Sequence, residues 1–155
     1  MRVDELIAYS RAFYPKWDDA YAEVLRKTFA LDGDARIRTL SKGNKARAGL
    51  LVALAYRPEL LVLDEPSSGL DLVVRRDILE AVIRTIADEG RTVLFSSHLL
   101  EEVERVAVHV TMIADGRVTL SDSLGSIKAA HAGLSLDEIF VKRLSADPSS
   151  LRSSG

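Results

Sequence analysis

Cysteine is absent from the 155-residue sequence, which excludes disulfides, thiolate metal sites and a cysteine nucleophile. Long apolar runs are missing too: the block Leu60 to Leu63 is followed by an aspartate, far short of the roughly 20 residues that span a bilayer. Residues 1–4 do not open a signal peptide, so we expect a cytoplasmic protein. The sequence also has no large excess of charge of either sign, because 23 acidic and 21 basic side chains leave a formal charge of -2. This balance gives no electrostatic reason to expect a nucleic-acid or anionic-membrane partner.

The residue pattern predicts one compact α/β domain, in which a helical piece precedes alternating strands and helices. Asp18 and Ser41 stand where helices should begin. Between residues 60 and 95, the order strand, helix, strand predicts a right-handed parallel crossover whose strands are buried on both faces. Asp115-Gly116 is typical of a hairpin turn. The expected helices cover residues 3–13, 18–30, 41–57, 74–86, 99–107, 123–130 and 135–145, and the expected strands cover 60–63, 92–95, 108–113 and 117–120.

The most informative block is Leu-Leu-Val-Leu-Asp-Glu-Pro-Ser-Ser-Gly-Leu-Asp at residues 60–71. A strand that delivers Asp64 to its carboxyl end places an oxygen ligand suited to Mg²⁺ where ligands bind in open α/β sheets. The alternative is two carboxylates that merely end a strand at the solvent edge. The whole block resembles the extended Walker B motif and D-loop of ABC ATPases. The resemblance implies that Asp64 holds magnesium through water, that Glu65 is the catalytic carboxylate, and that Asp71 belongs to the nucleotide-binding D-loop.

Residues 40–44, Leu-Ser-Lys-Gly-Asn, resemble the ABC signature motif, whose usual form is Leu-Ser-Gly-Gly-Gln. A capping serine and exposed backbone N–H groups at the start of a long helix form an anion site. Ser41 and Gly43 match the usual form of the motif, and the resemblance implies that both residues contact nucleotide. Lys42 replaces a glycine and could add a charge toward phosphate. Simple helix capping also explains Ser41, and this alternative stays open.

His98 lies 33 residues after Glu65, directly behind the second expected strand. A lone histidine in such a place is more often a surface or capping residue. The ABC family keeps a switch histidine here that contacts the γ-phosphate, so the resemblance implies a catalytic role for His98. We interpret His109 and His131 as ordinary strand and loop residues.

A phosphate-binding loop is missing from the sequence. It needs Gly-x-x-x-x-Gly-Lys-Ser/Thr, because backbone donors cradle the phosphates and the lysine reaches their outer oxygens, yet no glycine here is followed by lysine. The family's Q-loop glutamine is missing as well, since the chain contains no glutamine. The resemblance therefore covers the C-terminal half of an ABC ATP-binding domain. It implies a partial P-loop NTPase with a helical signature subdomain (1–57), a RecA-like parallel-sheet half (58–144) and a disordered tail (145–155).

ABC subunits work as head-to-tail dimers in which one subunit's P-loop side and the other's signature side enclose each ATP. The resemblance implies a truncated ATP-binding subunit of an ABC transporter, with ATP and Mg²⁺ as cofactors that both require a partner subunit. The expected partners are a second ABC ATPase subunit and a membrane-spanning subunit at the inner face of the membrane, met through residues 3–30. The alternative is a non-hydrolysing regulatory or vestigial module that docks on an intact subunit. We expect no measurable hydrolysis by the chain alone.

Overall fold

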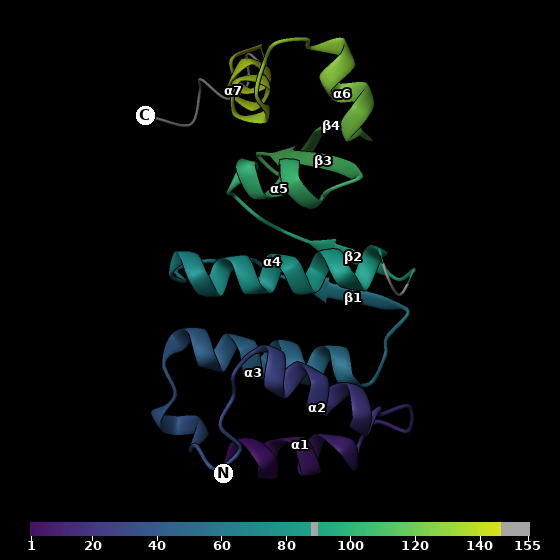
Figure 1. Ribbon diagram of the computed structural model, residues 1–155. Coiled ribbons are helices and arrows are strands. Elements are labelled where there is room, and N and C mark those ends of the chain that lie inside the picture. Colours follow the sequence, from purple (N-terminus) through teal and green to yellow (C-terminus); the bar gives the residue numbers. More distant parts are fainter. Residues whose placement is uncertain (88–89, 147–155) are drawn as a thin grey trace. The chain divides into compact units, whose positions relative to one another are not determined.

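The computed structural model describes residues 1–87 and 90–146, and the chain divides into two compact units between Ser97 and His98. The first unit contains α1 (Val3–Arg11), α2 (Asp19–Thr28), a 3-10 turn (Ile37–Thr39), α3 (Lys42–Ala55), β1 (Leu60–Leu63), α4 (Leu72–Ala87) and β2 (Thr92–Phe95) (Figure 1). The second unit contains α5 (Leu100–Val106), β3 (His109–Ala114), β4 (Arg117–Ser123), α6 (Leu124–Ala130) and α7 (Leu136–Ala146). Within the described residues, no helix combines the length and apolar character of a membrane span.

Two capping side chains begin the main helices of the first unit, as predicted. The Asp18 carboxylate accepts from the Tyr21 N–H at 2.8 Å, and the Ser41 hydroxyl accepts from the Asn44 N–H at 3.2 Å. Helix α3 ends at Ala55, slightly before the predicted end, and Arg57 has a φ of 54°. The Arg57 guanidinium turns back, donates to Asp18 at 3.0 Å and lies 3.6 Å from the Tyr21 ring centroid. The start of α2 is thereby tied to the end of α3.

Strands β1 and β2 form a parallel pair in which Leu61 faces Val93 and Leu63 faces Phe95. The predicted parallel arrangement is confirmed. The prediction that both faces of these strands are buried is wrong, because side chains on alternating positions have different surroundings. Leu61 is 2% exposed and belongs to the core formed with α3 and α4, whereas Val62 is 61% exposed. The apolar cluster that contains Leu61 includes side chains of α3 and α4, and α4 packs against β2 (Figure 1).

The second unit is built on an antiparallel hairpin of β3 and β4. Asp115 and Gly116 both have positive φ, 49° and 72°, as a tight hairpin turn requires, so the predicted turn is confirmed. The unit has its own apolar core, made of Val110, Met112, Ile127, Leu136 and Ile139. The predicted disordered tail (145–155) lies outside the described residues from 147 onward, and its first two positions belong to the end of α7.

The Asp18 cap makes a prediction about the pH dependence of stability. The Tyr21 N–H and then the Arg57 guanidinium hold the pKa of Asp18 below its ordinary value. The stabilisation by Asp18 is therefore present above the ordinary carboxyl pKa and is lost as the pH falls through the lowered folded-state pKa. We expect Asp18→Ala to reduce the free energy of unfolding by about 1 kcal/mol at pH 7, the usual effect of losing such a cap. Urea titrations at pH 7 and under acidic conditions should show the difference from the native chain shrinking with acid.

The neighbouring Asp19 supplies a matched control. It forms an exposed ion pair with Arg11 at 3.4 Å, and exposed pairs contribute little. Asp19→Ala should have the smaller effect at pH 7, and equal losses for the two variants would contradict the capping account.

Candidate functional site

The carboxyl ends of β1 and β2 are joined by the hydroxyl of Ser96. The Ser96 Oγ donates to Asp64 Oδ1 at 2.6 Å and accepts from the Glu65 N–H at 2.8 Å. The Ser96 N–H in turn donates to the carbonyl of Leu63 at 2.9 Å, which extends the parallel pairing by one step. Glu65 has a φ of 42°, a left-handed conformation that is uncommon for a residue with a side chain. One hydroxyl therefore fixes both the Asp64 carboxylate and the turn that carries Glu65.

Asp64 suits the magnesium role that the sequence suggests. Among the described residues, the only hydrogen bond to its carboxylate is the one that Ser96 donates to Oδ1. No group of three or more acidic or histidine side chains that could enclose a metal occurs in the described parts of the chain. Mg²⁺ in nucleotide sites is commonly held by one or two carboxylates together with waters and substrate phosphates rather than by an all-protein cage. The donor set at Asp64 fits that kind of site.

Gly43 of the signature segment is buried where α3 meets α4. A Cβ at this position would lie 2.7 Å from the Val74 Cγ2, too close for an ordinary contact. Further along the same two helices, the Arg47 guanidinium donates to the Asp77 carboxylate at 2.5 Å, and both side chains are largely buried. The glycine therefore has a packing role that needs no nucleotide: it allows the start of α3 to approach the first turns of α4.

The Asp71 carboxylate accepts from the N–H groups of Val73 and Val74 at 3.1 and 3.0 Å, and so caps the start of α4. Lys42 extends from the start of α3 over the turn before this cap, where a Cβ on Gly69 would collide with the lysine ammonium. Gly69 has a φ of 65°, which also favours glycine. The signature segment and the D-loop are thus in direct contact.

A cavity of about 370 Å³ brings part of the predicted site together. Its lining includes Lys42 of the signature segment and the carboxylate residues Asp64 and Glu65. The cavity also extends along the apolar side chains of α3 and β1, of which Val62 is one. His98 is the first residue of the second unit, and its catalytic role stays a prediction.

Ser96 was not among the predicted site residues, although the sequence contains a signal for it. The parallel register pairs Leu63 with Phe95, so the next residues along the two strands, Asp64 and Ser96, meet at the same edge. A polar residue directly after the second of two adjacent strands could have been assigned to the site on this basis.

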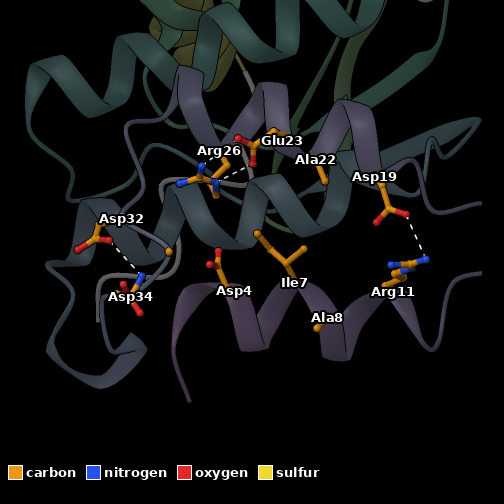
Figure 2. Close-up of a pocket in the computed structure, with 11 residues that line it drawn as sticks. Asp4, Ile7, Ala8, Arg11, Asp19, Ala22, Glu23, Arg26, Asp32 and Asp34 are labelled. Atoms are coloured by element: carbon orange, nitrogen blue, oxygen red, sulfur yellow. Dashed lines mark hydrogen bonds and ion pairs between the residues drawn. The ribbon is translucent and has the colours of Figure 1, made fainter.

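A second concave surface, the α1–α2 groove, lies in the helical part of the first unit. Its volume is about 530 Å³, and five acidic and two basic side chains line it, a formal charge of -3. In Figure 2, Ile7 points from α1 toward α2, and Arg11 reaches Asp19. The Arg26 guanidinium donates to both carboxylate oxygens of Glu23 and, with Lys27, lowers the pKa of Glu23 to about 2. The full set of lining residues is Asp4, Ile7, Ala8, Arg11, Asp19, Ala22, Glu23, Arg26, Asp32, Gly33 and Asp34.

Two carboxylates at the end of a parallel strand pair, with a capped helix start nearby, lie where α/β domains commonly bind nucleotides. Residues 13–104, more than half of the chain, match the family model "AAA domain, putative AbiEii toxin, Type IV TA system". The ABC transporter ATP-binding protein YtrB of Bacillus subtilis is 32% identical over 127 residues, which cover 82% of this chain and 44% of YtrB. Nod factor export ATP-binding protein I of Paraburkholderia xenovorans is 36% identical over 77% of this chain and 38% of its own length. The chain belongs to the ABC family of ATP-binding proteins.

Solved structures agree with this assignment. An ATP-binding subunit of an ABC transporter has a TM-score of 0.78 at 26% identity, over 92% of this chain and 62% of that chain. The ATP-binding cassette MJ0796, solved as a dimer in a post-hydrolysis state with ADP and Pi, has a TM-score of 0.60 at 22% identity, over 68% of this chain and 46% of that chain, and shows the likeness of the fold. The chain spans less than half the length of the two curated relatives.

The Gly43 contact predicts a measurable coupling between two residues. Gly43→Ala should reduce the free energy of unfolding by about 1 to 3 kcal/mol, because the added methyl overpacks the α3–α4 contact. Val74→Ala should also destabilise, by opening a cavity. In the double variant the methyl fills part of that space, so the combined loss should be smaller than the sum of the two single losses. Urea unfolding of the four proteins measures this difference.

A control pair uses Gly49, on the same helix, where an added Cβ meets nothing within 4 Å. Gly49→Ala combined with Val74→Ala should be additive, since the two sites share no contact. Additive losses for the Gly43 pair as well would contradict the close packing of α3 on α4.

Proposed function

We propose that this chain forms part of the ATP-binding subunit of an ABC transporter, in which ATP binding and hydrolysis at a dimer interface drive transmembrane transport. The observation that carries the proposal is the Ser96 hydroxyl, which fixes Asp64 and Glu65 at the carboxyl edge of a parallel strand pair. Relatives that are named as transporter ATP-binding proteins support it.

Each predicted site residue has a proposed role in that reaction. Asp64 would hold Mg²⁺ through water, and the bound ion neutralises charge on the phosphates. Glu65, on the turn that Ser96 fixes, would accept a hydrogen bond from the attacking water and polarise it. His98 would contact the γ-phosphate, and Asp71 would support the D-loop through its cap on α4.

The sequence supplies no phosphate-binding loop, so the proposal includes a partner subunit that holds the ATP. The start of α3 offers backbone N–H groups, the positive end of a 14-residue helix and the Ser41 hydroxyl. Lys42 adds a positive charge beside them. These groups would close over the phosphates of an ATP bound to the partner's P-loop, which gives one composite site.

The composite site predicts that MgATP is hydrolysed only when this chain is mixed with a complete ABC ATP-binding subunit. The purified chain should show no MgATP hydrolysis by itself, whereas ATP should promote its association with a complete ABC ATP-binding subunit. Ser41→Ala should weaken this association by roughly tenfold, since a lost hydrogen bond to a charged group is worth about 1.5 kcal/mol or more. Analytical ultracentrifugation with and without MgATP, together with phosphate release, measures both effects.

Ser123 is a matched control because it also caps a helix, with its hydroxyl accepting from the Ser126 N–H at 3.0 Å. Ser123→Ala removes a capping serine without touching the signature segment and should leave the association unchanged. Hydrolysis by the chain alone at the rate of a complete subunit would contradict the proposal.

The second candidate is a non-hydrolysing regulatory module that docks on an intact ABC subunit. Glu65→Gln separates the two functions. It keeps the size of the side chain and removes its charge, so turnover in the mixture should fall if Glu65 polarises water and should not change if the chain only regulates.

We place contact with the membrane-spanning subunit at the α1–α2 groove. Eight of the eleven residues that line this groove lie within residues 3–30, the region that the family resemblance assigns to contact with the coupling helix. Its apolar floor of Ile7 and Ala22 and its formal charge of -3 suit a short helix with small apolar and basic side chains. Through this contact the chain would lie at the cytoplasmic face of the membrane.

A bulky side chain in the α1–α2 groove should block contact with the membrane-spanning subunit. Ala8 lines the groove and is exposed, so Ala8→Trp adds bulk there without burying a strained side chain. We expect it to reduce co-purification with the cognate membrane subunit by about tenfold. Ala20→Trp is the control, since Ala20 is exposed on the same pair of helices and lies outside the groove. Equal effects of the two tryptophans would contradict this location.

A further inference from the structure

The Ser96 hydroxyl makes two hydrogen bonds through one oxygen, and we call this pair of bonds the Ser96 bridge. The bond that it donates to Asp64 Oδ1 is 2.6 Å long, within the range of bonds from a hydroxyl to an ionised carboxylate. The bond that it accepts from the Glu65 N–H is 2.8 Å long. The backbone of Ser96 is itself held, because its N–H donates to the Leu63 carbonyl at 2.9 Å. The hydroxyl is therefore the part of Ser96 that can respond to a change at either end of the bridge.

The two bonds of the Ser96 bridge depend on each other. Hydrogen bonds in a chain polarise one another, so a hydroxyl that donates to a carboxylate is a better acceptor through the same oxygen. A divalent cation held at Asp64 draws negative charge from the carboxylate and weakens the bond that Ser96 donates. The bond that Ser96 accepts from the Glu65 N–H then weakens as well. Occupancy of Asp64 thus reaches the backbone of Glu65 through the serine oxygen.

The turn at the receiving end of the bridge is strained. Glu65 has a φ of 42°, and a residue with a side chain keeps such a conformation only where the surrounding contacts hold it. The Ser96 bridge supplies one of these contacts, at the Glu65 N–H. A change in the strength of this one bond therefore alters the stability of the turn that carries the Glu65 carboxylate.

We propose that Ser96 is a positioning residue that couples the binding of a divalent cation at Asp64 to the conformation of the turn at Glu65. This proposal rests on the function proposed above, from which it takes the roles of Asp64 and Glu65, and it deepens that function. The carboxylate that polarises water changes its position when the metal carboxylate becomes occupied. Occupancy by the cation and placement of Glu65 are then linked steps, and the link is one hydroxyl.

The test is amide NMR of the isotope-labelled 155-residue chain, titrated with magnesium chloride and, for comparison, with potassium chloride at equal ionic strength. In the native sequence, Mg²⁺ should shift the Glu65 amide resonance, and Asp64→Asn should abolish this response. Ser96→Ala should abolish it too, and should make the Glu65 amide exchange with solvent roughly threefold to tenfold faster, as expected for one lost hydrogen bond. Ser96→Thr keeps a hydroxyl and should restore both the response and the slower exchange.

Ser135 is the matched control, because its hydroxyl makes the same two kinds of bond. It donates to the Glu138 carboxylate at 3.1 Å and accepts from the Glu138 N–H at 3.3 Å. Ser135→Ala removes this pair of bonds from the second unit and should leave the response of Glu65 to Mg²⁺ unchanged.

Two results would overturn the proposal. Asp64 and Glu65 are neighbours in the chain, so a Glu65 response that survives in Ser96→Ala travels along the backbone and not through the hydroxyl. Absence of any Glu65 response to Mg²⁺ in the native sequence contradicts the coupling as well. Nucleotide and partner subunit are absent throughout, so a failed coupling is distinguishable from failed association or turnover in the mixture with a complete subunit.

Discussion

The site depends on the pairing of two short parallel strands and on the hydroxyl that continues it. Parallel pairing aligns the carboxyl ends of β1 and β2, so polar residues that follow the strands must meet at one edge. Ser96 holds Asp64 and the Glu65 backbone in place, because its hydroxyl donates to the Asp64 carboxylate and accepts from the Glu65 N–H. An adjacent pair of acidic residues tends to separate through charge repulsion. Here the backbone turns sharply at Glu65, which has a φ of 42°.

Helix packing positions the second half of the site. Gly43 permits close contact with Val74, and the Arg47–Asp77 ion pair holds the same two helices further along. The start of α3 is therefore coupled to the D-loop cap at Asp71 within one unit. This explains why a glycine follows Ser41 and Lys42 without reference to a phosphate: a larger residue would push the start of α3 away from α4.

The elements that local patterns specify were predictable. Asp18 and Ser41 cap their helices as expected, and Asp115-Gly116 forms the hairpin turn. The burial of the strands was not predictable. A continuous apolar run such as Leu60 to Leu63 indicates that a strand tends to be buried, but it does not show which elements pack on each of its faces. The bridging role of Ser96 depends on register between strands some thirty residues apart, which local patterns do not encode. The α1–α2 groove depends in the same way on the packing of two helices.

Electrostatics explains why the described site needs further groups before it can hold a nucleotide. Asp64 and Glu65 present negative charge at the strand edge, and a triphosphate brings more of the same sign. Lys42 is the one cation that lines their cavity among the described residues, and a single exposed ammonium cannot balance both carboxylates and phosphates. A bound Mg²⁺ offsets part of the repulsion, and the rest requires a cradle of backbone donors.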